Sequence, residues 1–385
     1  MRVEEIETPE SKKRYLLVDD EGEPIEPVFM FLRYKDNAGK GRNTLRAYCY
    51  HLKHFFEFLQ QKEYDYRHIG LDEMAEFIRW LQTPHRDVKV ATLKPIGVGL
   101  QASTINTYIG TVTEFYDYLM RHDDYSLKLS QKMKKQLPGF RKGFKDFLYH
   151  INKDRDFDSK ILKLKVPKKR PKTISKDKIA TLQGACSNLR DQFLLQLLWE
   201  SGFRIGECLS LWIGDFLIDQ RKIDLKDRGE LVNGAEIKTV CSPRKIDVSS
   251  DLINMYMDYI AECHTDEVDT NHVFIKLSGQ NKYQPMEYPD VTSLFLRLRK
   301  KTGIDVTPHM FRHSHFNTLR KQGWDFSKIR VRGGWSNVQT PIQIYSHPDE
   351  EEMYESWKKS ETTMKLNKGT SESLEEELQS IFKEN

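Results

Sequence analysis

The sequence predicts a mainly α-helical protein with two domains, an all-helical first domain and a mixed α/β second domain with a small β-sheet. Three observations support this prediction. Apolar residues recur at helical spacing over about 25–125, short alternating segments occur between 222 and 248, and a lysine-rich stretch separates the two regions. A length of 385 residues also fits two domains better than one.

The first 24 residues read as an N-terminal arm that favours β structure. Residues 14–18 (RYLLV) form a plausible strand, and the Asp-Asp-Glu-Gly run at 19–22 is a turn signal. We therefore expect a short strand in the arm, closed by a turn before the helical region begins.

The region 25–125 is predicted to be a small helical domain. Asn43 is a good N-cap for a helix whose apolar positions include Leu45, Leu52 and Leu59. A second helix is marked by Leu71 and its apolar repeats, and a third is expected to be capped by Ser103. The stretch 84–100 contains proline and glycine and reads as a loop.

A basic linker is predicted over 126–172. Between residues 128 and 178 there are 18 Lys or Arg against five acidic residues. Pro167 and Pro171 disfavour a helix and keep the chain extended. One interpretation is a solvated linker. The other is a segment that lies along nucleic-acid phosphates, with contacts from Lys168, Lys169, Arg170 and Lys172.

The region 173–355 is predicted to be the mixed α/β domain. Residues 193–199 form an apolar helix, and 222–225, 236–240 and 245–248 alternate like short strands. A tail over 356–385 is expected to end in a helix with an apolar stripe along one side. That stripe consists of Leu374, Leu378, Ile381 and Phe382.

Composition narrows the class of protein. The five cysteines are scattered, without metal-ligand spacing, which argues against a disulfide framework or a zinc site. No apolar run has the length of a membrane span, and the acidic first ten residues lack the apolar core of a signal peptide. We therefore expect a soluble cytoplasmic protein without metal or cofactor.

Four local patterns carry candidate chemistry, and they occur in one order. The first is Gly-Phe-Arg-Ile-Gly-Glu at 202–207, and the second is the segment 237–248, which contains Lys238. The third is His-Met-Phe-Arg-His at 309–313, and the fourth runs from Trp335 to Tyr345. Each pattern is weak alone, but their order and context together are specific.

This set resembles the catalytic domain of the tyrosine recombinases, the phage integrase family. The helical region 25–125 resembles the SAM-like core-binding domain of that family, so the resemblance covers almost the whole chain. The opening residues look like integrases and transposases of mobile resistance elements. The resemblance implies a catalytic set of Arg204, Lys238, His309, Arg312, Trp335 and Tyr345.

The chemistry of phosphodiester cleavage explains these residue types. Negative charge builds on the non-bridging oxygens, and arginine offers them paired donors, as expected for Arg204 and Arg312. Tyr345 would be the nucleophile, with His309 as candidate base. Trp335 can only donate or pack, because indole has no acceptor nitrogen. The resemblance gives Lys238 the task of protonating the leaving 5′ oxygen.

Several neighbours receive supporting roles. Glu207 and Asp215 are expected to orient Arg204, and Arg244 and Lys245 are candidates for phosphate contact. His313 is left open between a function and an ordinary structural role. Trp335 and Tyr345 are ten residues apart, one more than is usual in the family, and Pro341 lies between them.

The predicted function is site-specific recombination through a 3′-phosphotyrosine, as an integrase or transposase of a mobile element. Relaxation of DNA by a type IB topoisomerase and non-catalytic DNA binding remain as alternatives. The expected partners are double-stranded DNA at element ends and target, further copies of this chain in a synaptic tetramer, and accessory recombination proteins. For the acidic tail, docking in cis or on a neighbouring protomer stays open.

Overall fold

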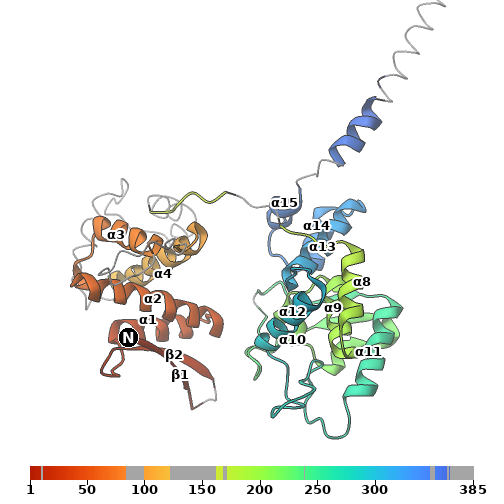
Figure 1. The fold of residues 1–385 in the computed structure, drawn as a ribbon, viewed down its shortest axis with the longest axis horizontal. Coiled ribbons are helices and arrows are strands. Elements are labelled where there is room, and N and C mark those ends of the chain that lie inside the picture. The colour runs from red at the N-terminus through yellow and green to blue at the C-terminus, as the bar shows by residue number, and fades with distance from the viewer. Residues whose placement is uncertain are drawn as a thin grey trace, which may run out of the picture. The chain divides into compact units, whose positions relative to one another are not determined.

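A computed structural model describes residues 1–9, 12–83, 99–121, 162–167, 171–237, 239–346, 352–361 and 364. The chain divides into two compact units, Met1–Lys169 and Arg170–Asn385. The division falls inside the predicted linker. Figure 1 labels the helices of both units and the strands β1 and β2 of the N-terminal unit. None of the helices within the described ranges is long and apolar enough to cross a membrane.

The N-terminal unit combines an antiparallel two-stranded ribbon with a set of helices. The strands pair from Arg2 opposite Val18 to Glu7 opposite Lys13. The elements, in order, are β1 (Arg2–Glu7), β2 (Lys13–Val18), α1 (Glu26–Asn37), α2 (Arg42–Lys62), a 3₁₀ turn (Tyr66–His68), α3 (Leu71–Gln82) and α4 (Ala102–Arg121).

One aromatic-rich core holds this unit together. Phe31 of α1, Phe55 of α2, Phe77 of α3 and Phe115 of α4 are fully buried, so all four helices contribute to one cluster. Phe31 packs edge-to-face on Phe115, with ring centroids 5.6 Å apart. The predicted apolar stripes therefore do face a common core.

The predicted helix starts differ slightly from those in the structure. α2 begins at Arg42 after Gly41, so Asn43 lies inside the helix and is not its N-cap. α4 begins at Ala102, one residue before the expected cap Ser103. Helix α1, whose buried residues are Pro27, Val28, Phe31 and Leu32, was not predicted as a separate helix.

Part of the predicted linker is anchored on the N-terminal unit. Leu162 and Leu164 pack against its core. The side chain of Asn106 in α4 donates to the Leu164 carbonyl at 2.9 Å and accepts from the Leu164 amide at 2.8 Å. An extended backbone segment is thus held by both of its polar groups. Residues around 164 belong structurally to the helical unit.

The C-terminal unit is mainly helical around a small sheet. Its elements are α8 (Lys176–Ala185), α9 (Leu189–Ser201), α10 (Ile205–Leu209), 3₁₀ turns (Ile213–Asp215 and Ile218–Gln220), β3 (Phe216–Leu217), β4 (Lys222–Leu225), β5 (Arg244–Asp247), α11 (Ser250–Cys263), α12 (Tyr288–Thr302), α13 (Pro308–Lys321), α14 (Phe326–Gly333) and α15 (Gln339–Tyr345).

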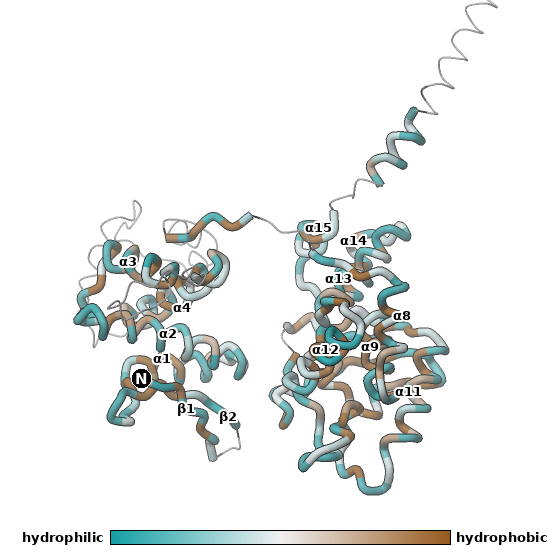
Figure 2. The backbone as a smooth tube through the Cα atoms, viewed as in Figure 1, coloured by the Kyte–Doolittle hydropathy of each residue, from teal (hydrophilic) through white to brown (hydrophobic). Residues whose placement is uncertain are grey.

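Helix α9 is the central element of this unit. Five of its apolar residues are fully buried, namely Phe193, Leu194, Leu195, Leu197 and Leu198. In Figure 2 hydrophobic stretches gather along α9 and its neighbours. A helix that is apolar on all sides must be covered on all sides, and α8, α11 and α13 pack around α9. The predicted fold class, mainly α with a small antiparallel sheet, is confirmed.

The sheet has the antiparallel order β3-β4-β5. β4 pairs directly with β5, with Leu225 opposite Arg244. The predicted strand at 236–240 was wrong, since its described residues lie in the connection between β4 and β5. Ala235 and Ile237 are buried there by packing, and a turn follows in which Ser242 N donates to Thr239 O at 2.9 Å. The alternation of apolar and polar residues over 236–240 therefore reflects the burial of side chains in a loop. This loop is not paired with a neighbouring strand among the described residues.

The predicted tail helix over 371–383 lies outside the described residues. The short helical stretch 352–361 before it is attached to α13 through Glu352, which accepts two hydrogen bonds from Arg320 at 2.7 and 2.8 Å.

The Asn106 anchor yields a prediction. Asn106→Ala removes both hydrogen bonds to Leu164, so we expect the N-terminal unit to lose about 1–2 kcal/mol and the Leu164 amide to exchange faster with solvent. Hydrogen exchange read at peptide resolution measures this. Thr107→Ala is the matched control, because that exposed hydroxyl bonds only the Ser103 carbonyl of its own helix. Equal exchange at Leu164 in both variants would contradict the anchor.

Candidate active site

A glycine turn between α9 and α10 positions Arg204. Gly202 has a φ of 64° and ends α9 in the left-handed conformation, which glycine adopts without strain. A β-carbon at Gly202 would lie 2.5 Å from His315 Cδ2. The turn therefore requires glycine both for its backbone angle and for the close approach of α13. Arg204 follows as the N-cap residue of α10.

Glu207 is the anionic centre of an arginine cluster. Arg204 Nη1 donates to Glu207 Oε1 at 2.7 Å, and the Arg204 amide donates to Oε2 at 2.9 Å. Arg244 donates to both oxygens, at 3.3 and 3.1 Å, and Arg312 Nη1 lies 3.9 Å from Oε2. Burial opposes ionisation of this carboxyl, but the three guanidinium groups outweigh it and lower its pKa.

Arg312 is buried and its direction is fixed. The side chain of this α13 residue is 4% exposed. Its Nη1 donates to the Gly202 carbonyl at 2.6 Å, and its Nη2 donates to the Gly333 carbonyl at 2.7 Å. Burial, and then the charge of Arg204, lower the pKa of Arg312, yet a guanidinium keeps its proton in proteins. Three guanidinium groups against one carboxylate leave the site with excess positive charge.

Trp335 packs on Arg312 with its ring face. The guanidinium carbon of Arg312 lies 4.5 Å from the indole centroid and 4.9 Å from the ring of Phe316. Trp335 also meets Phe316 edge-to-face at 4.7 Å and lies 6.1 Å from the Tyr345 ring. The described contacts therefore fit the packing role that the sequence allowed for this tryptophan.

Tyr345 is the last residue of α15 and is 4% exposed. Its ring belongs to a small apolar cluster with Phe316 and Ile329. Burial raises the pKa of the Tyr345 phenol, while the nearby charges of Arg312 and Arg204 act to lower it. Tyr345 Oη lies 2.9 Å from His313 Nδ1. The structure thus brings Tyr345, Arg204, Arg312 and Trp335 together.

His313 is the residue that sequence reasoning undervalued. Burial, followed by the charges of His309 and Arg312, lowers the pKa of His313 to about 4. The available signal was its spacing: His309 and His313 are four residues apart on α13 and therefore share one side of the helix. Their ring centroids are 6.1 Å apart, and His309 is the more exposed of the two.

Lys238 lies outside the described residues, but its neighbours border the arginine cluster. Thr239 Oγ1 lies 3.4 Å from the Gly334 carbonyl and 2.7 Å from Ser242 Oγ. Arg204 Nη1 also reaches Ser242 Oγ at 3.4 Å. The loop that carries Lys238 therefore contacts both the first arginine and the turn before Trp335.

Other predicted site residues are placed differently from expectation. Asp215 does not orient Arg204, because it accepts from Arg228 at 2.6 Å and from the Trp212 amide at 2.9 Å. Arg244 is 6% exposed and engaged with Glu207 rather than facing solvent. Lys245 and Lys172 are exposed, whereas Lys168, Lys169 and Arg170 lie outside the described residues.

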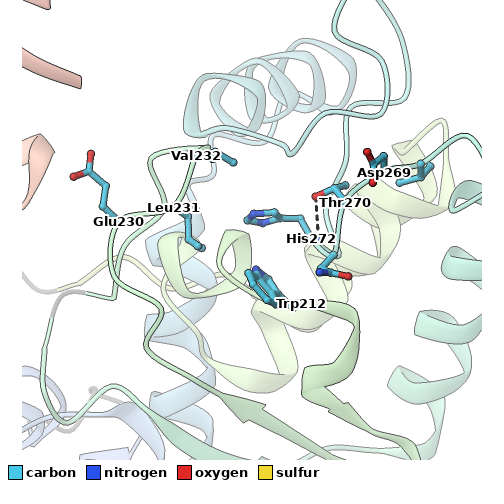
Figure 3. Close-up of a pocket in the computed structure, with 9 residues that line it drawn as sticks. Trp212, Glu230, Leu231, Val232, Asp269, Thr270 and His272 are labelled. Carbon is cyan, nitrogen blue, oxygen red and sulfur yellow. Dashed lines mark hydrogen bonds between the residues drawn. The ribbon is translucent and has the colours of Figure 1, made fainter. Parts of the chain in front are cut away.

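Figure 3 shows a separate cavity of about 500 Å³ in the C-terminal unit, lined by residues that include Trp212, Leu231 and His272. None of the predicted catalytic residues is among the residues that line it. Chemistry at this cavity would lack the arginines and the tyrosine, so the cluster around Glu207 is the better candidate active site.

Comparison with known proteins gives matches over both units of the chain. The model of the phage integrase family matches residues 172–352, and that of the phage integrase N-terminal SAM-like domain matches 31–123. Transposase A from transposon Tn554 of Staphylococcus aureus is 38% identical over 355 residues, covering 92% of this chain and 96% of the relative.

The chain belongs to the phage integrase family. A more distant member, tyrosine recombinase XerA of Pyrococcus horikoshii, is 24% identical over 319 residues, 82% of this chain and 87% of the relative.

Solved structures of the family share the fold. The Tn1549 transposon integrase in complex with transposon right end DNA has a TM-score of 0.56 at 16% identity, covering 86% of this chain and 98% of that chain. The XerH site-specific recombinase bound to a palindromic difH substrate has a TM-score of 0.55 at 16% identity, covering 84% and 81%. At this identity the likeness concerns the fold alone.

The Glu207 cluster yields a prediction for stability. Glu207→Gln leaves three guanidinium groups around a neutral, buried side chain, so we expect a loss of roughly 3–5 kcal/mol in the free energy of unfolding. Denaturant titration measures it. Asp224→Asn is the control, since Asp224 pairs only with the half-exposed Lys226 and Lys245 at 3.8 and 3.6 Å and should cost at most about 1 kcal/mol. Similar losses in both variants would contradict a central role for Glu207.

A second prediction concerns pH. Burial, then the charge of Arg332, lowers the pKa of His315 from 6.5 to about 3. The unfolded chain therefore binds a proton that the folded chain excludes, and stability falls as pH drops from about 7 towards 3. We expect His315→Asn, which can still donate to the Trp199 carbonyl, to flatten this dependence by roughly 1–4 kcal/mol. An equal pH dependence of stability in His315→Asn and in the wild type would contradict the assignment.

Proposed function

We propose that this protein is a site-specific DNA recombinase of a mobile element, acting as its integrase or transposase through a 3′-phosphotyrosine at Tyr345. The observation that carries the proposal is the arrangement of Arg204 and Arg312 around one carboxylate, Glu207, with Tyr345 near enough for the charges of both arginines to favour a lower pKa of its phenol. Similarity to the Tn554 transposase over almost the whole chain supports the mobile-element assignment.

The reaction follows from the positions of these groups. Tyr345 Oη attacks the phosphorus, an Oη–P bond forms, and the P–O5′ bond breaks. Arg204 and Arg312 stabilise the charge that grows on the non-bridging oxygens. The 5′ oxygen takes a proton, which family resemblance assigns to Lys238. Bond energy is kept in the phosphotyrosine, so the reverse attack by a 5′ hydroxyl can rejoin strands without ATP.

Two units joined by a basic linker suit a clamp around double-stranded DNA. With Leu164 anchored on Asn106, and the Ile174 amide bonded to Ser314 Oγ at 2.7 Å, only nine residues connect the two anchors. Fully extended, they span roughly 35 Å. Lys168, Lys169, Arg170 and Lys172 fall in this interval of the sequence, and in such a clamp they would meet phosphates as the chain crosses the duplex.

The same proposal covers the wider setting. Strand exchange between element ends and target joins two duplexes, so we propose that four protomers assemble on DNA, with accessory proteins where the element requires them. The acidic tail would then contact protein rather than DNA. Access to DNA also implies a cytoplasmic enzyme. Relaxation by a type IB topoisomerase and non-catalytic binding are alternatives that no comparison favours.

Tyr345→Phe tests the proposal. The change removes one hydroxyl, so the variant should bind DNA nearly as well as the wild type but form no covalent adduct. The assay uses nicked suicide duplexes that tile the DNA flanking the gene, followed by denaturing electrophoresis. Tyr283→Phe serves as a control and should form adduct normally. A Tyr345→Phe protein that still becomes attached to DNA would remove Tyr345 as the nucleophile.

A further inference from the structure

The end of α15 contacts α13 through the hydroxyl of Tyr345. Tyr345 Oη and His313 Nδ1 are 2.9 Å apart, within hydrogen-bond distance. The two rings are tilted at 58°, with centroids 5.8 Å apart.

We propose that His313 is a catalytic residue, whose Nδ1 accepts the hydrogen bond of the Tyr345 hydroxyl and takes the phenol proton as Oη attacks phosphorus. The inference rests on the proposed function. It differs from the family resemblance, which points to His309 as the base.

The direction of the hydrogen bond follows from acidity. A phenol O–H is a much stronger acid than a neutral imidazole N–H, so the phenol donates and Nδ1 accepts. The proton of the imidazole then resides on Nε2. This tautomer leaves the Nδ1 lone pair directed at the one proton that the nucleophile must lose.

The surroundings explain why this base is weak until substrate arrives. Burial and the charges of His309 and Arg312 disfavour a second proton on His313. A phosphodiester bound by Arg204 and Arg312 adds negative charge beside these groups, which offsets their repulsion and raises the basicity of His313. Burial also keeps the phenol of Tyr345 protonated in the free protein. The nucleophile is therefore activated where the phosphate is bound.

The proton balance closes over the full cycle. During cleavage the proton moves from Tyr345 Oη to His313 Nδ1, the Oη–P bond forms, and the 5′ oxygen leaves with a proton from its own acid. During rejoining the 5′ hydroxyl returns its proton to that acid as its oxygen attacks phosphorus, the Oη–P bond breaks, and the proton on Nδ1 returns to the leaving phenolate. No oxidant, metal or further reactant is needed.

The two histidines are placed for different tasks. His309 lies in the first turn of α13 and is exposed, whereas His313 is half-buried one turn later, against Tyr345. An exposed imidazole at a helix start suits donation to a phosphate oxygen. A shielded imidazole in contact with the nucleophile suits proton transfer, because water cannot replace it.

His313→Asn provides the test. The asparagine amide can occupy the position of Nδ1 and keep a hydrogen bond to Tyr345, but it cannot hold a proton near neutral pH. We expect covalent attachment in a single turnover to slow by about 10²-fold or more, with DNA binding unchanged. The probe is the suicide duplex that the wild type attacks fastest. His264→Asn, a half-buried histidine that bonds the Val273 carbonyl, should attach DNA at the wild-type rate.

A more acidic nucleophile separates proton transfer from positioning. 3-Fluorotyrosine placed only at position 345 loses its proton more readily, so it should restore much of the rate in His313→Asn and change the wild type little. Attachment by His313→Asn within twofold of wild type would overturn the proposal. An equal effect of fluorotyrosine in both proteins would also overturn it, because His313 would then only hold the ring.

Two further controls keep the outcome decisive. If His313→Asn does not fold, His313→Gln is used for the same comparison. The longer glutamine side chain puts its amide near the position of Nε2. Failure of the proposed function looks different: the wild type itself would then form no adduct with any tiled duplex. If the wild type and His313→Asn both attach DNA at the same rate, only the role of His313 is rejected and the proposed function stands.

Discussion

The active-site cluster depends on a single buried carboxylate. Glu207 receives hydrogen bonds from Arg204 and Arg244 and lies 3.9 Å from Arg312. Without this anion, three guanidinium groups could not share a nearly dry space, because their mutual repulsion grows as water is excluded. With it, they are held together and still carry more positive charge than Glu207 neutralises. An incoming phosphodiester would neutralise this excess positive charge.

The scaffold around Glu207 is built from turns that bring distant segments together. Gly202 ends α9 and presents its carbonyl to Arg312. The Gly333 carbonyl receives the other end of the same guanidinium. Gly334, with a φ of 64°, leaves space where a β-carbon would lie 2.8 Å from Arg244 Nη1. Hydrogen-bond donors that are already fixed need little reorientation when charge develops in a transition state, which is the advantage of such a pre-arranged site.

The aromatic residues have a complementary task. Phe316 and Trp335 cover Arg312 and border Tyr345, which buries both the cation and the phenol. Burial disfavours the charged form of each group, so it lowers the pKa of Arg312 and raises the pKa of Tyr345. The arrangement therefore combines an electropositive site with a buried tyrosine whose hydroxyl lies within hydrogen-bond distance of His313, as the proposed proton transfer requires.

Sequence by itself determined the fold class, the helical periodicities of the first domain, strand 222–225 and the motifs that contain Arg204, Glu207 and Arg312. These follow from local rules: periodicity reports which side of a helix is apolar, and ordered polar motifs report the chemistry required.

Tertiary structure decided what each polar group touches. Asp215 and Arg244 are both charged neighbours of the motifs, yet one binds Arg228 and the other binds Glu207. The contact of His313 with Tyr345 joins residues 32 positions apart, and the anchoring of Leu164 on Asn106 joins residues 58 apart. Spacing along the chain cannot reveal such pairs, because they arise only when separate helices pack and bring their side chains into one volume.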